Sequence, residues 1–410
     1  MSKKHKKTIA QAGKDLFRGK RVLVRVDFNV PQNEDATVAD DSRIRAALPT
    51  IKFLSEAGAK VILVSHLGRP KGKSVKLSLK PIADHTSEKL HVKVCHLEHT
   101  IGPEVEAHIN EMKDGDIVLL ENVRFHEGEE KNDREFSKQL AKLADVYVND
   151  AFGTAHRAHS STAGVTEFVK PALAGFLLDK EIKALSGVVD NPNRPFATII
   201  GGAKVSSKIG VLENLIDRAD VLVIGGAMAF TFLKAQGLEI GKSLVELDRV
   251  DFCKDLLAKA KAKGVRVILP EDLVCAPELK PGQTTVTVAA NQIPADQMGL
   301  DVGPLTVAAV KKELEACHTI LWNGPLGAFE TPGFEHGTYA LIDILVELTK
   351  AGVKTIIGGG DSVAALEEKD IAPDAFTHVS TGGGASLEFL EGLELPGVAC
   401  LDPAEGVPAV

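Results

Sequence analysis

Basic side chains follow several short apolar runs in the first half of the sequence, at the point where each run ends. The run at 60–65 leads into His66 and Arg69, and the run at 116–121 leads into Arg124. Guanidinium groups match the oxygens of phosphate and carboxylate, so converging arginines suit a small, multiply charged anion. The candidates for such a site are Asp27, Asn29, Arg43, His66, Arg69, Arg124, His156, Arg157 and His159.

Taken singly, each candidate also fits a structural role. An exposed arginine is commonly a surface cation or an ion-pair partner, and Asp27 and Asn29 also suit a turn or a helix cap. For Asp41 and Ser42 the helix cap is the preferred interpretation. Four separate run ends that carry basic residues are harder to explain in this way, so the set favours an anion site.

Glycine takes the corresponding positions in the second half. The run at 196–200 enters Gly201-Gly202-Ala203-Lys204, and Lys208 follows four residues later on a predicted helix. Glycines let a ligand approach the backbone closely, and helix-start amides with two ammonium groups suit a polyphosphate. This segment therefore predicts a phosphate site.

Two further runs end in glycine. The run at 354–358 enters Gly359-Gly360-Asp361-Ser362, where amides can cradle phosphate and the carboxylate can hold Mg²⁺. The run at 378–380 enters a loop with Gly382, Gly383 and Gly384. One such loop is often only a tight turn, but three on one sheet favour a nucleotide phosphate site.

Two other phosphate-binding patterns are absent from the sequence. Residues 237–243 resemble a P-loop, but three residues separate the two glycines where that motif requires four. No G-x-G-x-x-G follows any predicted strand, which weakens the alternative of an NAD-dependent dehydrogenase.

The elements that position these residues read as repeated βα units. Nearly pure apolar runs are typical of strands covered on both faces, and segments such as 44–57 and 205–218 have helical periodicity. The pattern predicts an α/β fold with doubly wound, Rossmann-like parallel sheets, in which ligands bind at the carboxyl ends of the strands. The predicted strands are 21–26, 60–65, 92–95, 116–121, 145–149, 196–200, 221–225, 265–269, 318–322, 354–358 and 378–380.

The length of 410 residues predicts two domains. Residues 177–185 read as a helix, and the Pro- and Asn-rich segment 188–195 is expected to end it and start the second domain. We place the first domain at 1–178 and the second at 179–393.

Composition excludes several other classes. A formal net charge of −8 and an aromatic content of 5% argue against nucleic-acid binding and anionic membranes. The five cysteines form no C-x-x-C pair, which fits a reducing, cytoplasmic location. The basic residues 1–7 precede no apolar signal region, and the longest apolar stretch, 221–233, is too short to cross a bilayer.

Together these segments resemble the phosphoglycerate kinase family over about residues 20–392. The matching blocks include Arg25-Val26-Asp27-Phe28-Asn29-Val30-Pro31, Ser65-His66-Leu67-Gly68-Arg69-Pro70, Asn149-Asp150-Ala151-Phe152-Gly153-Thr154-Ala155-His156-Arg157, Trp322-Asn323-Gly324-Pro325 and Gly358-Gly359-Gly360-Asp361. Ala227 stands where the family often has a third glycine, and residues 331–335 differ from common versions. Neither departure removes a charged site residue, which disfavours a non-catalytic scaffold with a retired site.

The resemblance implies that the first domain binds 3-phosphoglycerate or 1,3-bisphosphoglycerate. The tail at 394–410 is expected to pack back on this domain. The residues implied to bind substrate are Asp27, Phe28, Asn29, Arg43, His66, Leu67, Gly68, Arg69, Arg124 and Arg157. Arg43 is implied to lie nearest the reacting carboxylate, and Arg69, Arg124 and Arg157 to hold the phosphate that is not transferred.

The resemblance also implies that the second domain binds Mg-ADP or Mg-ATP, with Asp361 as the magnesium ligand and Glu330 at the ribose. The implied nucleotide-binding residues are Gly202, Ala203, Lys204, Lys208, Gly226, Gly299, Leu300, Pro325, Glu330, Gly359, Gly360, Asp361 and Ser362. The implied catalytic residues are Arg43, Lys204, Gly360 and Gly383.

The implied reaction is reversible transfer of a phosphoryl group between 1,3-bisphosphoglycerate and ADP, with a carboxyl group as the acceptor in reverse. Arginines in one domain and lysines in the other predict two domains that face each other across a hinged cleft and close for transfer. We expect a monomer, because one chain supplies every implied site residue.

Overall fold

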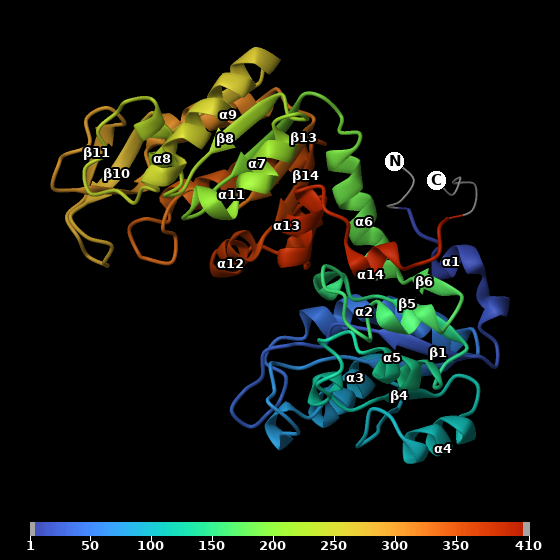
Figure 1. The fold of residues 1–410 in the computed structure, drawn as a ribbon. Coiled ribbons are helices and arrows are strands. Elements are labelled where there is room, and N and C mark those ends of the chain that lie inside the picture. Colours follow the sequence, from blue (N-terminus) through green and yellow to red (C-terminus); the bar gives the residue numbers. More distant parts are fainter. Residues whose placement is uncertain (1–4, 405–410) are drawn as a thin grey trace. The chain divides into compact units, whose positions relative to one another are not determined.

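The computed structural model describes residues 5–404, and the chain divides into two compact units (Figure 1). The first unit contains the chain up to Lys183 and again from Glu394, and the second contains Ala184–Leu393. Both the predicted boundary at 178/179 and this division lie inside helix α6 (Phe176–Val189). No helix among the described residues is long and apolar enough to cross a membrane.

The first unit is built on a six-stranded sheet in the order β3-β4-β2-β1-β5-β6, and every neighbouring pair is parallel. Its strands are β1 (Arg21–Arg25), β2 (Lys60–Val64), β3 (Val94–His96), β4 (Ile117–Leu119), β5 (Val146–Asn149) and β6 (Ala172–Ala174). The helices are α1 (Ile9–Ala12), α2 (Ser42–Glu56), α3 (Lys80–Leu90), α4 (Pro103–Glu111), α5 (Arg134–Ala141) and α14 (Pro396–Ala399). Consecutive residues of β1, β2 and β5 are buried, as strands covered on both faces require.

The second unit contains a parallel sheet in the order β15-β14-β13-β7-β8-β9 and a small antiparallel sheet in the order β11-β10-β12. The parallel strands are β7 (Phe196–Ile200), β8 (Val221–Ile224), β9 (Arg266–Ile268), β13 (Thr319–Asn323), β14 (Lys354–Gly358) and β15 (His378–Val379). The antiparallel strands are β10 (Asp272–Ala276), β11 (Val286–Ala289) and β12 (Met298–Val302). The helices are α7 (Ile209–Leu215), α8 (Ala229–Ala235), α9 (Val250–Lys263), α10 (Pro304–Glu315), α11 (His336–Lys350), α12 (Gly360–Glu368) and α13 (Gly384–Leu390).

The predicted fold class is confirmed, since both large sheets are parallel and alternate with helices along the chain. Every predicted strand overlaps an observed one. The continuous helix predicted over 205–218 is wrong. A 3₁₀ turn, η6 (Val205–Ser207), precedes α7, and Lys208 between them has a non-helical backbone.

The tail returns to the first unit. Lys7 donates its amide to the carbonyl of Asp402 (2.9 Å), and the Asp402 carboxylate lies 2.7 Å from the Lys170 ammonium. Closer to the strand ends, Asn149 Nδ2 donates to the carbonyl of Gly397 (2.8 Å). The last six residues of the predicted tail, 405–410, lie outside the described residues.

The first turn of helix α6 is hydrogen-bonded to the side chain of Asp150, a fully buried carboxylate that directly follows β5. Its Oδ1 accepts hydrogen bonds from the amides of Leu177 (2.9 Å) and Leu178 (3.2 Å). The side chain of Thr50 also interacts with this carboxylate and opposes the effect of burial on its pKa. Burial raises the pKa of Asp150 from 3.8 to about 7.

The raised pKa predicts a pH-dependent stability. Between about pH 4 and 7, Asp150 keeps a proton in the folded state that it releases in the unfolded state. The contribution of Asp150 to the free energy of unfolding is therefore fully present below about pH 4 and is lost as pH rises through about 7. Asp150→Asn keeps the acceptor and removes the charge. We expect it to raise the free energy of unfolding at about pH 8 by about 2–4 kcal/mol, with little effect near pH 4.

Urea unfolding of both proteins at the two pH values measures this effect. Asp179→Asn is the matched control, because Asp179 lies on the same helix and pairs with Lys183 (2.6 Å) close to solvent. An Asp150→Asn effect of equal size at both pH values would contradict the prediction.

Candidate functional site

In the first unit, the predicted anion-binding residues lie at the carboxyl edge of the parallel sheet. Asp27 and Asn29 follow β1, His66 follows β2 and Arg124 follows β4. Because β4, β2, β1 and β5 are adjacent, their carboxyl ends meet at one edge of the sheet. The fold thus gathers side chains that lie nearly 100 residues apart in the sequence.

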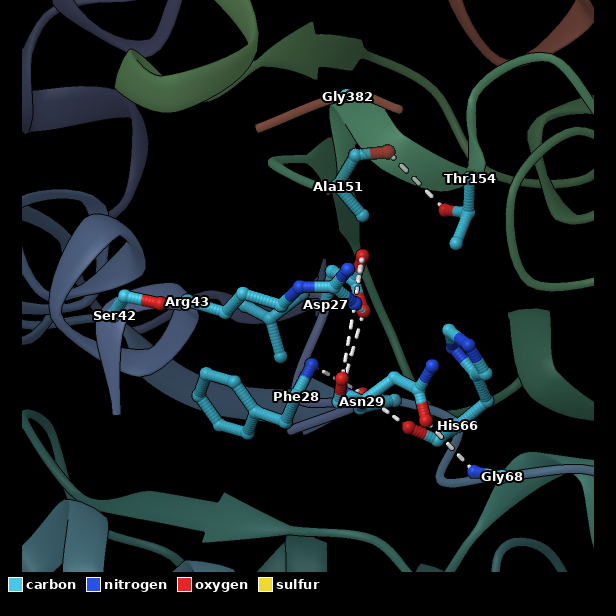
Figure 2. Close-up of polar contacts among 12 residues, drawn as sticks. Asp27, Phe28, Asn29, Ser42, Arg43, His66, Gly68, Ala151, Thr154 and Gly382 are labelled. Carbon is cyan, nitrogen blue, oxygen red and sulfur yellow. Dashed lines mark hydrogen bonds and ion pairs between the residues drawn. The ribbon is translucent and has the colours of Figure 1, made fainter. Parts of the chain in front are cut away.

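A polar group joins the end of β1 to α2 (Figure 2). One Arg43 nitrogen, Nη1, donates to the Asn29 carbonyl (2.9 Å) and lies 3.3 Å from both Asp27 carboxylate oxygens. The Asn29 side chain accepts from the amide of Gly68 (2.8 Å). The Arg43 side chain remains 38% exposed, so the rest of its guanidinium is free to meet a ligand.

Backbone contacts hold the loop after β2 in place. Asn122 accepts from the amide of Leu67 (3.2 Å) and donates to its carbonyl (2.8 Å). Arg124 donates to the carbonyl of Gly68 (2.9 Å), and Phe28 donates its amide to Ser65 Oγ (2.9 Å). The predicted residues Phe28, Leu67 and Gly68 are therefore fixed by the fold and help to shape this edge.

The electrostatics of the same edge are strongly positive. Burial lowers the pKa of His66 well below its usual range, and the nearby charges of Arg25, Arg124 and Arg43 lower it further. Burial also lowers the pKa of His159 to about 4, so this histidine is neutral at pH 7. Such a site favours an anion over a cation.

Two other predicted arginines are exposed in the loops around this edge. Arg69 follows Gly68, and Arg157 follows the 3₁₀ turn η4 (Phe152–Thr154) after β5. The charge of Arg69 contributes to the lowered pKa of Arg124, and that of Arg157 to the lowered pKa of His159. Both guanidinium groups are therefore within electrostatic reach of the central residues.

In the second unit, a cavity of about 360 Å³ opens beside the carboxyl ends of the parallel strands. Its wall is largely apolar and includes Phe230, Leu273 and Met298, and three acidic residues, Asp301, Glu330 and Asp361, also line it. A cavity of this size and character suits a purine nucleoside. The predicted residues that line it are Gly202, Ala203, Gly226, Gly299, Leu300, Pro325, Glu330 and Asp361.

Glycine is required where the β7 and β8 loops meet. Gly226 has a φ of +69°, and a Cβ at this position would press against the backbone of Gly202 and the carbonyl of Pro325. Gly201 is equally confined, because a Cβ there would overlap the Pro325 carbonyl. The glycines thus let three backbone segments converge on one side of the cavity.

The two predicted lysines differ in their surroundings. Lys204 is exposed and has an extended backbone, whereas Lys208 is half-buried and donates to Asn323 Oδ1 (2.5 Å). Burial lowers the pKa of Lys208, and the charge of Asp361 opposes this effect. The lysines therefore reach the site from irregular backbone before α7 rather than from one helix face.

The β14 loop and the start of α12 carry the remaining charged residue. Gly359 has a φ of +92°, and α12 begins at Gly360, which leaves Asp361 exposed in its first turn. Ser362 is buried and accepts from the amide of Gly324 (2.7 Å), so it braces the β13 loop. Gly383 has a φ of +50° and immediately precedes α13.

A magnesium ion at this position would have one protein carboxylate. No group of three or more His, Cys, Asp or Glu side chains suited to a metal occurs within residues 5–404. Mg²⁺ commonly uses one or two carboxylates, with phosphate and water as its other ligands, rather than an all-protein site. An exposed Asp361 on the wall of a nucleotide-sized cavity fits that mode of binding.

Several residues at these sites were not predicted from the sequence. Asn122 and Asn323 are fully buried at strand ends and position Leu67 and Lys208, respectively. Asp301 lines the cavity and accepts from the amide of Gly337 (2.8 Å) at the start of α11. Position directly after the predicted strands 116–121 and 318–322 could have singled out the two asparagines, but no local pattern identifies Asp301.

Comparison with known proteins gives concordant matches. The phosphoglycerate kinase family model matches residues 14–393. A phosphoglycerate kinase of Thermosynechococcus vestitus is 56% identical over 97% of this chain and all of its own length. The cytosolic phosphoglycerate kinase of Nicotiana tabacum is 54% identical over 97% of this chain and 99% of its own.

Solved structures agree with these sequence matches. The phosphoglycerate kinase of Coxiella burnetii superposes with a TM-score of 0.87 at 42% identity, covering 94% of this chain and 96% of that one. The enzyme of Pyrococcus horikoshii gives a TM-score of 0.78 at 32% identity over the same shares. The chain therefore belongs to the phosphoglycerate kinase family.

Proposed function

We propose that this chain catalyses reversible phosphoryl transfer between 1,3-bisphosphoglycerate and ADP, giving 3-phosphoglycerate and ATP. One observation carries the proposal beyond family membership. A single chain combines an arginine-rich sheet edge with a glycine-lined, nucleotide-sized cavity that contains a carboxylate. A kinase that acts on a small phosphorylated acid needs both.

We assign the acid to the first unit. Arg69, Arg124 and Arg157 are proposed to hold the phosphate that is not transferred, with His66 beside them. Asp27 and Asn29 are proposed to hold the hydroxyl region of the substrate, and their contacts with Arg43 and Gly68 support a preorganised arrangement. The cationic surroundings of His66 favour an anionic ligand here.

We assign the nucleotide to the second unit. The apolar cavity is proposed to take the adenine, and Glu330 to accept hydrogen bonds from the ribose hydroxyls. Lys204, Lys208 and the amides near Gly359, Gly360 and Gly383 are proposed to meet the phosphates. Asp361 is the residue that would hold Mg²⁺, which when bound offsets phosphate charge.

The proposed chemistry needs no general base. In the ATP-forming direction an oxygen of the ADP β-phosphate attacks the acyl phosphorus, and the carboxylate leaves. In reverse, the attacking carboxylate has a pKa near 4 and is already ionised at pH 7. The task of the protein is therefore to align the groups and stabilise charge on the phosphoryl group in transit, for which Arg43 and Lys204 are proposed.

Transfer also requires the two ligands to meet, so we propose that the segments joining the units act as a hinge. Closure would exclude water, which otherwise hydrolyses an acyl phosphate. We expect small-angle X-ray scattering to give a smaller radius of gyration with 3-phosphoglycerate and a non-hydrolysable Mg-ATP analogue together than with either alone. An unchanged radius with both bound would contradict the hinge.

The test of the function itself is a coupled assay with purified protein, 3-phosphoglycerate and Mg-ATP. We expect acyl phosphate and ADP to form only when both substrates are present. Hydrolysis of ATP at the same rate without the acid would overturn the assignment. We further propose a cytoplasmic monomer, and the five free thiols, Cys95, Cys253, Cys275, Cys317 and Cys400, support a reducing compartment.

A further inference from the structure

We propose that Arg25 is a positioning residue that holds His66 as the neutral tautomer with its proton on Nε2. In this role Arg25 would let His66 offer a hydrogen-bond donor, Nε2–H, to the anion in the first unit. This functional part of the inference rests on the proposed function. The structural part of the inference depends only on the contacts of Arg25, Ser161 and Glu129 behind the site.

Arg25 is the last residue of β1 and is fully buried. Its side chain uses all three nitrogens within the protein. Nε donates to Ser161 Oγ (2.8 Å), Nη1 donates to the carbonyl of Val26, and Nη2 lies 3.2 Å from His66 Nδ1. A side chain held at three points in this way has little freedom to serve as a mobile ligand for substrate.

The contact with His66 determines where the imidazole proton resides. A guanidinium nitrogen carries only donor hydrogens and has no acceptor capacity. Nη2 can therefore form a hydrogen bond to Nδ1 only if Nδ1 presents its lone pair, which leaves the proton of the neutral ring on Nε2. Protonation of Nδ1 would instead point an N–H at a buried cation.

A buried carboxylate offsets the charge of Arg25. Glu129 has no exposed surface and accepts from the Ser161 amide (2.9 Å) and from the Ser161 hydroxyl (2.5 Å). The single hydroxyl proton of Ser161 is thus used towards Glu129, so its oxygen can only accept from Arg25. Tyr147 fixes the same residue from the other side through a hydrogen bond to the Ser161 carbonyl (2.7 Å).

The other charged groups around His66 act in the same direction. Arg43 from α2 and Arg124 from the 3₁₀ turn η3 (Val123–Phe125) lower its pKa together with Arg25, whereas the nearby His159, whose pKa burial lowers to about 4, is neutral at pH 7. A neutral ring donates through Nε2 without adding another cation to this cluster. Anion binding would then require no proton uptake, and the KM for 3-phosphoglycerate should not follow a histidine titration between about pH 5 and 8.

The direct test is nitrogen-15 NMR of the ligand-free protein with labelled histidine and arginine side chains. His66→Gln identifies the His66 signals among those of the 13 histidines. We expect an unprotonated Nδ1, a protonated Nε2, no titration from about pH 5 to 8, and a scalar coupling across the Arg25–His66 hydrogen bond. A protonated Nδ1, or a ring that titrates in this range, would overturn the proposal without any variant.

A variant separates positioning from simple structural support. Arg25→Gln removes the charge and the fixed donor, and the neutral His66 ring is then expected to populate the tautomer with its proton on Nδ1 as well. Because His66 is proposed to contact the phosphate that is not transferred, the KM for 3-phosphoglycerate should rise about 10-fold while kcat changes little. Arg21→Gln is the matched control, since Arg21 lies on the same strand and pairs with Asp145 at the surface.

The outcomes distinguish this proposal from the proposed function. If Arg25→Gln folds and His66 keeps its proton on Nε2 alone, Arg25 is not the positioning residue. If the variant does not fold, the proposal is decided by two measurements on the wild-type protein alone: the scalar coupling across the Arg25–His66 hydrogen bond and the tautomer of His66. A protein that shows the predicted His66 spectrum but transfers no phosphoryl group would contradict the function and leave the Arg25 contact standing.

Discussion

Replacement of Arg43 by alanine is expected to lower kcat by about 10²–10³-fold, equivalent to about 3–4 kcal/mol of transition-state stabilisation. Among the described residues of the first unit, the contacts of Arg43 with the Asn29 carbonyl and the Asp27 carboxylate use one guanidinium nitrogen. The remaining donors are partly exposed and are proposed to face the charge that develops on the transferred group. Steady-state kinetics with both substrates saturating measures the effect.

The affinity for ADP should stay at its wild-type value in Arg43→Ala, because the nucleotide is assigned to the other unit. Arg45→Ala is the matched control. Arg45 lies on the same helix, is mostly exposed and pairs with Asp41 (2.7 Å). If Arg43→Ala retained the wild-type kcat, Arg43 would have no part in the transition state.

Asp361→Ala is the second change with a large expected effect, a loss of about 10³-fold in kcat/KM for Mg-ADP. Asp361 lines the cavity and is the acidic residue in the first turn of α12. We expect the affinity for ADP to become insensitive to Mg²⁺, since the protein would lose its ligand for the ion. Isothermal titration of ADP with and without Mg²⁺ measures this directly.

Glu367→Ala serves as the control for Asp361→Ala. Glu367 is an exposed carboxylate at the other end of α12, outside the residues that line the cavity. Its replacement removes the same charge from the same helix and should leave the Mg²⁺ dependence unchanged. Asp361→Ala protein that still binds ADP more tightly with Mg²⁺ would show that the ion has a different ligand.

The strands of the two large sheets could be predicted from sequence because most are short, apolar and buried on both faces. The exceptions have physical reasons. β6 has the sequence Ala-Leu-Ala, which carries no β-branched residue and no alternation. In the small antiparallel sheet, β11 is partly exposed and β12 contains Gly299 and Asp301, so neither resembles a buried parallel strand.

Candidates such as His66 and the glycine loops could be predicted because they directly follow predicted strands, whereas Arg43 and Glu330 were assigned roles only through the family resemblance. The supporting residues could not be predicted. Arg25 lies within an apolar run, and Glu129 and Ser161 come from loops that only the tertiary fold brings together. The prediction of one helix carrying Lys204 and Lys208 was wrong because apolar periodicity does not detect the 3₁₀ turn that lies between them.

The most direct measurement of the proposed reaction is phosphorus-31 saturation transfer on the protein at equilibrium with 3-phosphoglycerate and Mg-ATP. We predict exchange of magnetisation between the ATP γ-phosphate and an acyl phosphate resonance, lost when either substrate is omitted. Exchange of the γ-phosphate with inorganic phosphate alone, or no exchange with both substrates bound, would contradict it.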